Sequence, residues 1–519
     1  MAFVNRKAKF YFLSFLRHDL KASITVFFVA LPLCLGISLA SGAPLYSGLV
    51  AGIIGGLLVS VIGSSELSVS GPAAGLTAIC ATAIAEMGSM EMFFLSVAAA
   101  GVIQLLLGVF RLGGFTHFIP SAVIKGMLAA IGIILISKQV PLLVGYSLPA
   151  FWTNDFFNIL TFHNAYSHLE SIYYHTSRGV IIIALLAMGL LVVWKKSVAK
   201  KITFLPASFI VVIFGVLLAM MFRRYFPSTV LDDSQFVNIP GDIFSGLKAP
   251  SVPTASALPL ILKNAILICF VASLETLLSV EAIDKLTPYS KSTSQNRELA
   301  AQGVANFFSG LLGGLPITAV IVRSSANVEA GAKTRLSGFF HGIWLVLLIL
   351  LIPAVINKIP YCVLAIILVR TGYNLAKPKM IRSVYKLGRE QFIPFMVTVF
   401  AILLTDLLIG VLIGFLYASY FIIKNTYRAG FTVGKTPEGH HTRYTIELAN
   451  NVSFINKKKL SEELNAIPPY SSVEVVGDHS VYIDYDVLEI INEYKLKARH
   501  KHISLHLRNV PEVETIQVH

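Results

Sequence analysis

The stretch Gly313-Gly314-Leu315-Pro316 interrupts a long apolar run and decides how the surrounding chain folds. Glycine is conformationally loose, and proline lacks an amide donor and clashes with the previous turn, so a helix cannot continue through this break. We predict that a new helix begins near Pro316 and covers residues 317–330, because proline suits the first helical position. The free amides at its start would carry the positive end of the helix dipole, which favours an anion.

Arg323 lies in this predicted half-helix, with Asn327 on the same face by i,i+4 spacing. The arginine adds a full positive charge close to the helix start. Two interpretations remain open at this point. The break is either a broken-helix binding site or a proline-kinked membrane span whose arginine reaches the surface.

Composition identifies the class of protein. Of 519 residues, 55% are hydrophobic and 13% charged, with a mean hydropathy of +0.72, whereas soluble domains hold roughly 25% charged residues. The chain is therefore predicted to be an integral membrane protein, without a cleavable signal peptide. Much of the net charge of +14 lies in short loops, which indicates membrane orientation and no nucleic-acid partner. The cysteines lack metal-ligand spacing, so no metal or other cofactor is predicted.

The apolar segments predict an all-α membrane domain of fourteen segments in two sets of seven. Residues 1–18 are predicted to form a basic amphipathic lead, and residues 19–428 a transmembrane domain, with repeats at about 19–222 and 258–425. Segments 72–87 and 316–331 are shorter than the roughly 20 residues that a crossing needs, so they are predicted half-helices. The other segments are predicted at residues 20–41, 45–62, 92–110, 119–137, 179–194, 204–222, 258–283, 298–314, 335–357, 361–376, 390–407 and 408–425.

Loop charge predicts the orientation of these segments. Basic residues gather in every second loop, as at Arg111, Lys200 and Lys379, whereas the alternate loops 146–178 and 223–257 are poorer in Lys and Arg. Positive loops stay in the cytoplasm. We therefore expect a multi-pass protein of the cell membrane with both termini cytoplasmic.

An internal repeat places a second break in register with the first. In the first set, the third segment opens with the Gly- and Pro-containing stretch Ser70-Gly71-Pro72-Ala73-Ala74-Gly75. In the second set, the third segment opens with the matching break at residues 313–316. Because seven is odd, the halves have opposite orientation, and the two half-helix starts converge on a site near the midplane. Each dipole favours an anion by roughly 1 to 2 kcal/mol.

These residues carry a resemblance to the SulP family of anion transporters, which includes sulfate permeases, cyanobacterial bicarbonate transporters, prestin and pendrin. The resemblance covers residues 19–425 and extends through a tail similar to the STAS domain. It implies a uracil-transporter-like fold of inverted repeats, in which a core moves against a gate, and usually a homodimer. The matching positions are Asp19-Leu20-Lys21-Ala22, Leu31-Pro32, Val69-Ser70-Gly71-Pro72, Glu275, residues 323–338, Thr405-Asp406 and residues 410–414.

The resemblance also implies the site. It places a small inorganic anion between two groups of amides, with Arg323 as the cation and Glu275 as the group that couples transport to Na⁺ or H⁺. Leu33 and Ile37 replace the more polar residues often found in the family, and Ile321 replaces a hydroxyl residue of the sodium-coupled members. The predicted substrate-binding residues are Leu33, Ile37, Ala73, Ala74, Gly75, Ala319, Val320, Ile321, Val322 and Arg323.

Glu275 and Arg323 are expected to face a cavity or each other, because an unpaired charge at the bilayer centre costs about 2.5 to 3.5 kcal/mol. Ser279 lies one turn beyond Glu275 and is a second predicted coupling residue. The alternative that the two charges only hold core helices together stays open. Glu86 is predicted to be interfacial.

The tail, residues 436–519, has the composition of a soluble domain. Strand-like alternation at Tyr444 and Ile446, a helix at residues 457–467 and a strand at residues 472–476 predict a small α/β domain. Asp486 stands where phosphorylatable STAS members carry a serine, so no phosphorylation switch is predicted there.

Three classes of function compete. Secondary anion transport explains both breaks together with Arg323 and Glu275, and bicarbonate is slightly favoured because the surface Ala73-Ala74-Gly75 offers few donors for a dianion. Sulfate, a dicarboxylate or chloride remain alternative substrates. A voltage-responsive or scaffold protein is the alternative of another class. An enzyme is not predicted, since the segments hold no nucleophile-base or metal motif.

Overall fold

The computed structural model describes residues 2–114, 119–146, 174–194, 205–239, 257–287, 292–351, 353–405, 407–438 and 441–512. The chain divides into two compact units, Met1–Lys386 with Thr398–Val411, and Leu387–Val397 with Leu412–His519. The predicted basic loop around Lys200, most of the loop 146–178 and Asp406 lie outside the described residues.

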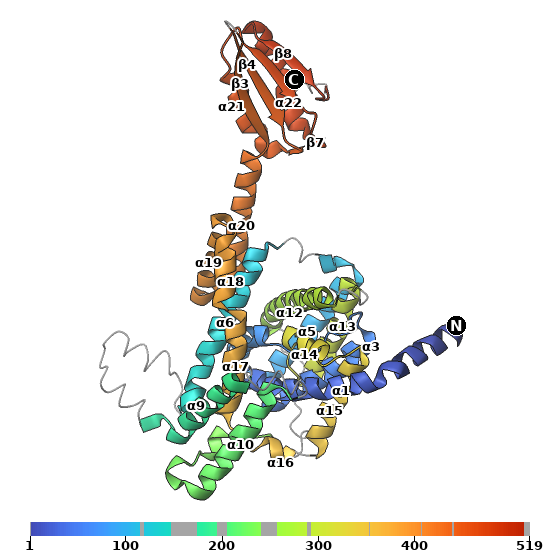
Figure 1. The fold of residues 1–519 in the computed structure, drawn as a ribbon, viewed down its shortest axis with the longest axis vertical. Coiled ribbons are helices and arrows are strands. Elements are labelled where there is room, and N and C mark those ends of the chain that lie inside the picture. Colours follow the sequence, from blue (N-terminus) through green and yellow to red (C-terminus); the bar gives the residue numbers. More distant parts are fainter. Residues whose placement is uncertain are drawn as a thin grey trace. The chain divides into compact units, whose positions relative to one another are not determined.

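The first unit is built from helices and two very short strands (Figure 1). Its N-terminal half contains α1 (Ala2–Ser41), α2 (Leu45–Ile54), the π-helix η1 (Gly55–Val59), α3 (Ser60–Ile62), β1 (Ser70–Pro72), the 3-10 turn η2 (Ala74–Leu76), α4 (Thr77–Met87), α5 (Met90–Val109), α6 (Ser121–Val144), α9 (Arg178–Val193) and α10 (Ala207–Tyr225). Its second half contains α12 (Leu258–Leu286), α13 (Gln295–Leu311), β2 (Ile317–Ala319), α14 (Ile321–Glu329), α15 (Leu336–Leu351), α16 (Pro353–Ile356), α17 (Tyr361–Leu375) and α18 (Pro378–Lys386). Two further helices, α19 (Arg389–Leu404) and α20 (Leu407–Arg428), are each divided between the two units.

Most predicted apolar segments coincide with these helices. The predicted lead is not a separate element, because α1 runs without interruption from Ala2 to Ser41. Seven helices among the described residues are long and apolar enough to cross a membrane, including Met90–Val109 and Leu258–Leu286. The molecule is therefore a mostly helical protein of the membrane type, and the number of fourteen segments stays a prediction.

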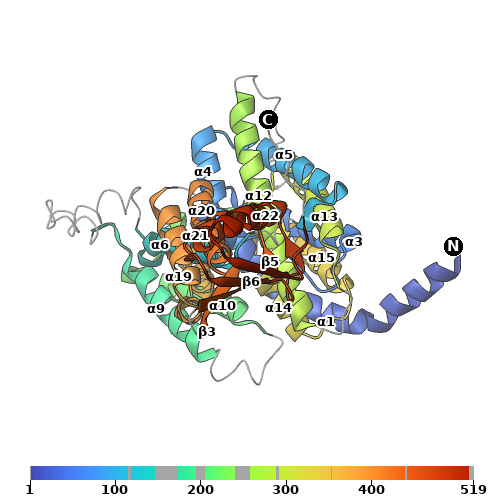
Figure 2. The ribbon, with the colours of Figure 1, turned by 90° about the horizontal axis from the view of Figure 1, so that it is seen from above.

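Glycines bring α5 and α13 into close contact, and the two helices lie side by side in both ribbon views (Figures 1 and 2). A Cβ atom at Gly303 would collide with the backbone of Leu105, and one at Gly101 would collide with the backbone of Phe307. Backbones can approach this closely only where side chains are absent, as is common between membrane helices. This contact packs α13, the helix that precedes β2, against α5 of the N-terminal half.

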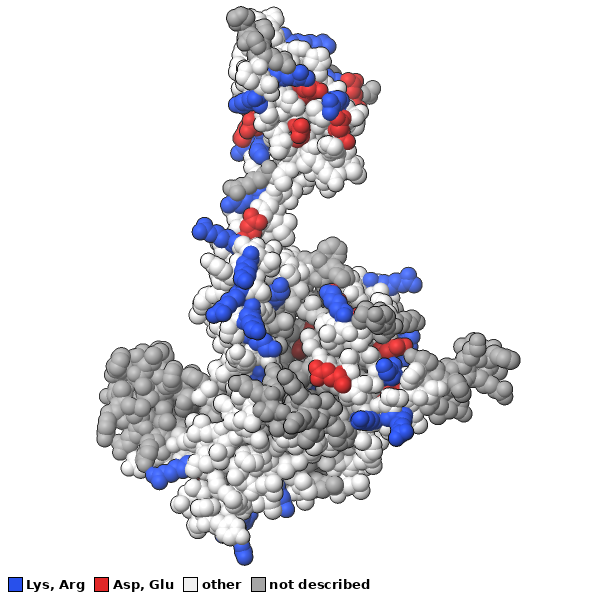
Figure 3. Space-filling view, in the orientation of Figure 1, with Lys and Arg blue, Asp and Glu red and all other residues white. Residues whose placement is uncertain are grey.

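The outer surface of α9 and α10 is apolar. Leu185, Val193, Leu217 and Met220 are exposed there, and Figure 3 shows that the lower part of the first unit carries few charged side chains. An exposed apolar surface of this kind suits contact with lipid.

The second unit contains a small α/β domain. Its sheet has the strand order β3-β4-β6-β8. The first pair, β3 (Phe431–Glu438) and β4 (His441–Leu448), is antiparallel. The strand β6 (Ser472–Val476) is parallel to β4, and β8 (Ser504–Arg508) is parallel to β6. The helices α21 (Lys457–Asn465) and α22 (Tyr485–His500) supply Leu460, Leu464 and Ile491 to its core. A separate pair is formed by β5 (Asn451–Val452) and β7 (Tyr482–Ile483). The strands β4, β6 and β8 and both helices agree with the predicted elements of the tail, whereas β3, β5 and β7 were not predicted.

Candidate functional site

The two sequence breaks meet as a pair of antiparallel strands. Ser70 lies opposite Ala319, and Pro72 lies opposite Ile317. All six residues of the pair are buried. The prediction that residues 317–319 open a helix is wrong, because these residues are extended and pair with β1, and α14 begins only at Ile321. The pairing joins the starts of the two half-helices.

Side chains of α13 and α12 hold β2 in place. Asn306 contacts both backbone groups of Ile317: its Oδ1 accepts from the amide at 2.6 Å, and its Nδ2 donates to the carbonyl at 3.0 Å. The same Nδ2 donates to Gln104 Oε1 at 2.7 Å, and Gln104 donates to Ser273 Oγ at 3.1 Å. Sequence reasoning missed this network, although a buried amide side chain in an apolar segment is a signal for it.

The start of α14 offers fewer free amides than predicted. The amide of Ala319 donates to Thr276 Oγ1 at 3.3 Å, and that of Val320 donates to Val69 O at 3.0 Å. No side chain caps the helix at Val320. The amides of Ile321, Val322 and Arg323 therefore have no carbonyl of a preceding helical turn to which they could donate. The amides left without an acceptor at this helix start are thus those of Ile321 and Val322, the last two of the four predicted residues, and of Arg323 itself.

The side chain of Arg323 is fully buried beside β1. Its Nη2 donates to Pro72 O at 3.3 Å and to Cys34 Sγ at 3.4 Å, whereas Nε and Nη1 have no hydrogen-bond partner among the described residues. Gly71 leaves room for the guanidinium, because a Cβ at Gly71 would collide with Nη1. This arginine therefore does not reach the surface, which argues against the interpretation of a proline-kinked span.

Asn327, on the same face of α14, has a different role. Its Nδ2 donates to Leu67 O at 3.0 Å. Ser324 acts similarly, since its hydroxyl accepts from the Val69 amide at 2.9 Å. Both side chains fasten α14 to the segment that leads into β1.

Glu275 lies against the other half-helix. A Cβ at Gly75 would come within 2.5 Å of Glu275 Oε2, so the carboxylate lies directly against the backbone of Gly75. No ion pair or hydrogen bond joins Glu275 to Arg323 within the described part of the chain, so of the two expected arrangements the direct contact between the charges is not formed. Ser279 is also buried on α12, one turn further on.

The remaining predicted residues divide into two groups. Ile321 and Val322 have exposed side chains, at 43% and 41%, so only their backbone could face a buried site. The other group is apolar and buried, and it consists of Leu33, Ile37, Ala73 and Ala74.

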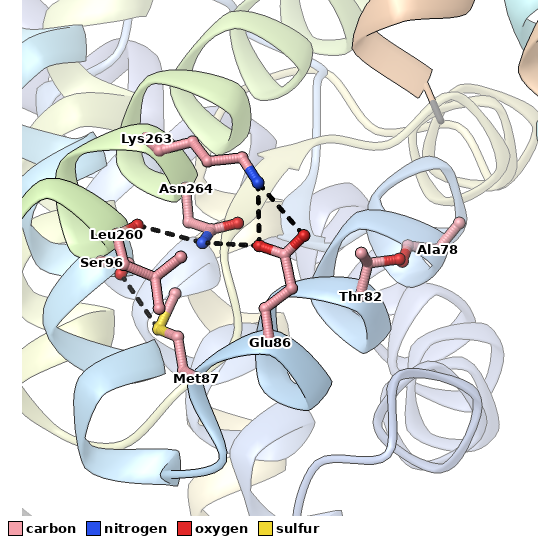
Figure 4. A network of polar contacts seen from close by, with 8 residues as sticks. All are labelled: Ala78, Thr82, Glu86, Met87, Ser96, Leu260, Lys263 and Asn264. Atoms are coloured by element: carbon pink, nitrogen blue, oxygen red, sulfur yellow. Dashed lines mark hydrogen bonds and ion pairs between the residues drawn. The ribbon is translucent and has the colours of Figure 1, made fainter. Parts of the chain in front are cut away.

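Glu86 lies in a polar network at the far end of α4 (Figure 4). Lys263 donates to both carboxylate oxygens, at 3.2 and 3.1 Å, and Asn264 donates to one of them at 3.5 Å. The Lys263 and Glu86 side chains are 55% and 35% exposed, and an exposed pair contributes about 0 to 1 kcal/mol. The network joins α4 to α12 at a place remote from the half-helix starts.

Three comparisons identify similar proteins. The model of the sulfate permease family matches residues 16–398. YvdB of Bacillus subtilis is 28% identical over 416 residues, which cover 80% of this chain and 75% of YvdB. The bicarbonate transporter BicA of Picosynechococcus is 26% identical over 417 residues, which cover 79% of this chain and 70% of BicA.

The solved structures show the same fold. The structure of the murine Solute Carrier 26 family member A9 anion transporter in its inward-facing state superposes with a TM-score of 0.76 at 15% identity, and covers 95% of this chain and 85% of that one. The family model, which spans most of the first unit and both half-helices, shows that the chain belongs to the sulfate permease family.

Proposed function

We propose that this anion transporter is a secondary active transporter that carries a small inorganic anion, with bicarbonate favoured over sulfate, by alternating access at a midplane site between the starts of η2–α4 and α14. As a family member the chain is a transporter of anions and not an enzyme. The observation that carries the finer proposal is Arg323, a fully buried guanidinium with two nitrogens lacking partners and no carboxylate at ion-pair distance in the described chain.

Charge balance supports an anion at this place. A buried cation without a counterion is costly, and a bound anion supplies the missing charge and the missing acceptors. The uncapped amides of Ile321 and Val322 and the start of η2 add the positive ends of two short dipoles. The β1–β2 pair fixes these donors relative to one another.

The apolar residues around the proposed site support a small monoanion as the substrate. Leu33, Ile37, Ala73 and Ala74 present apolar surface and no side-chain donors. A dianion such as sulfate needs more donors than a monoanion, because its desolvation is more costly. Glu275 and Ser279 are the residues we assign to coupling with Na⁺ or H⁺, and we expect a homodimer with cytoplasmic termini in the cell membrane.

Uptake into proteoliposomes tests the proposal. Labelled bicarbonate, sulfate, chloride and a dicarboxylate are compared, with and without sodium or proton gradients. We expect saturable uptake with bicarbonate preferred, loss of uptake in Arg323→Gln, and normal uptake in Arg224→Gln, which changes an exposed arginine at the end of α10. Absence of uptake of all four anions by folded protein would contradict transport, and a preference for sulfate would contradict the assigned substrate.

A further inference from the structure

Helix α13 carries three polar side chains at intervals of four residues, Glu298, Gln302 and Asn306. Residues four apart lie on the same face of a helix, so the three side chains form one polar row. All three are buried. A buried polar side chain is costly unless its hydrogen-bonding groups have partners. The partners of the polar row therefore show what it does.

The polar row contacts both strands that join the half-helices. Gln302 Nε2 donates to the hydroxyl of Ser70, the first residue of β1, at 2.7 Å. Asn306, one turn further along, binds both backbone groups of Ile317, the first residue of β2. Four residues of α-helix rise about 6 Å, and paired strands lie about 4.8 Å apart. The two amide side chains are thus spaced to hold neighbouring strands.

Glu298 supports Gln302 and the segment that leads into β1. Its Oε2 accepts from the amides of Ser64 at 2.9 Å and Ser65 at 3.1 Å. Its Oε1 accepts from Gln302 Nε2 at 3.4 Å. Because a carboxylate oxygen accepts hydrogen bonds, this contact turns the nitrogen of the Gln302 amide, rather than its oxygen, toward Glu298 and Ser70. The orientation of Gln302 is therefore fixed from two sides.

Gln302 has no donor left for an anion. The two hydrogens of its Nε2 are used by Ser70 and Glu298. Its Oε1 has no hydrogen-bond partner in the described part of the chain, and an acceptor oxygen does not attract an anion. The side chain can act on the proposed site only through the strand that it holds.

The position of β1 determines where the donors of the proposed site lie. Pro72, the last residue of β1, accepts from Arg323 Nη2 at 3.3 Å, and η2 begins two residues later. On the other side, β2 ends at Ala319 and α14 begins two residues later. A shift of β1 would therefore move both a contact of the guanidinium and the start of a half-helix. Ligands bind most tightly to donors that are already held in place.

We propose that Gln302 is a positioning residue, which holds β1 beside β2 and thereby sets the affinity of the transporter for its anion. The inference rests on the proposed function, and it leaves coupling with Glu275 and Ser279. Without the bond to Ser70, the anion must order β1 as it binds, which weakens binding. The expected effect of losing this bond is a higher KM at an unchanged maximal rate.

The test measures initial rates of labelled bicarbonate and labelled sulfate uptake into proteoliposomes over a range of anion concentrations. Ser70→Ala and Gln302→Met each remove the bond between the two side chains. Each should raise KM about three- to tenfold, as expected for the loss of one hydrogen bond, and leave kcat within about twofold. The double variant should resemble the single variants, because all three lack the same bond.

Ser23→Ala is the matched control. Ser23 is a buried serine of α1 whose hydroxyl accepts from Trp344 Nε1 at 3.0 Å. This change removes a hydrogen bond of the same kind, so it should lower the unfolding temperature in detergent while KM stays that of the wild type. A merely structural role of Ser70 would give the same pattern in Ser70→Ala.

Two results overturn the inference. One is a wild-type KM in Ser70→Ala, and the other is a double variant in which the effects of the single changes multiply. Where a variant shows no uptake, the shift of its unfolding temperature with added bicarbonate or sulfate measures its affinity, and Ser70→Ala decides alone if Gln302→Met does not fold. Absence of uptake by the wild type overturns the proposed function instead.

Discussion

Arg323 is a charged residue whose burial is difficult to explain without an anion. We expect Arg323→Gln to leave the anion-free protein as stable as the wild type or more stable, because removing an unpaired buried charge removes its desolvation cost. Anion affinity should fall about 10- to 100-fold, since a charge-assisted contact contributes about 1.5 to 3 kcal/mol. Thermal unfolding in detergent with increasing bicarbonate or sulfate measures both effects. A lower unfolding temperature together with an unchanged anion-induced shift would assign Arg323 a structural role only.

Glu275 and Arg323 bind separate partners, so their contributions to stability should be independent. We expect the effects of Glu275→Gln and Arg323→Gln to add within about 0.3 to 0.5 kcal/mol in the double variant, as for residues without shared contacts. A double-mutant cycle on unfolding in detergent measures the difference. Coupling above about 1 kcal/mol would mean that the two charges interact in the folded protein, which is one of the two arrangements that the sequence left open.

Only part of the site could be predicted at the level of residues. The proline and glycine breaks located both half-helices, because such residues interrupt an apolar run in a visible way. The backbone partners of Ala319 and Val320 could not be predicted, since they come from Thr276 and Val69 far along the chain.

The helix pair α5 and α13 makes a prediction at the scale of elements. Gly303→Ala should separate the two helices, because its Cβ would collide with the backbone of Leu105. We expect a loss of about 1 to 3 kcal/mol, as for other overpacked positions, and weaker transport because α13 also holds β2 through Asn306. Thermal unfolding and uptake measure these effects.

The control for this change is Gly189→Ala on α9. No atom lies within 4 Å of a Cβ at Gly189, so this change should be neutral or stabilise by up to about 1 kcal/mol, since alanine favours helix more than glycine does. Equal stability and equal uptake of Gly303→Ala and Gly189→Ala would show that the contact between α5 and α13 tolerates a side chain.

The long helices were predictable from hydropathy, whereas β1 and β2 were not. A strand of three residues is too short to show alternation of apolar and polar side chains. Its pairing also depends on a partner in the other half of the chain. The helix predicted to begin at Ile317 therefore begins at Ile321, after the pairing ends.

The orientation of the whole molecule is tested by labelling introduced cysteines from either side of the membrane. Lys379 and Asp232 are exposed in the first unit. Lys379→Cys should react only with reagent on the cytoplasmic side, and Asp232→Cys only from outside, because positively charged loops remain in the cytoplasm. Reaction of both positions from one side would exclude the seven-plus-seven arrangement.

The pairing of β1 with β2 also constrains how a cell must make this protein. Ser70 emerges from the ribosome well before its partner Ala319, by a delay of roughly 12 to 50 s for about 250 residues at ordinary rates of synthesis. During that time β1 has no strand to pair with, and the first half must wait in the bilayer with those backbone groups unsatisfied. The first half of the chain, expressed alone, should therefore be a target for chaperones and membrane proteases until the second half is supplied.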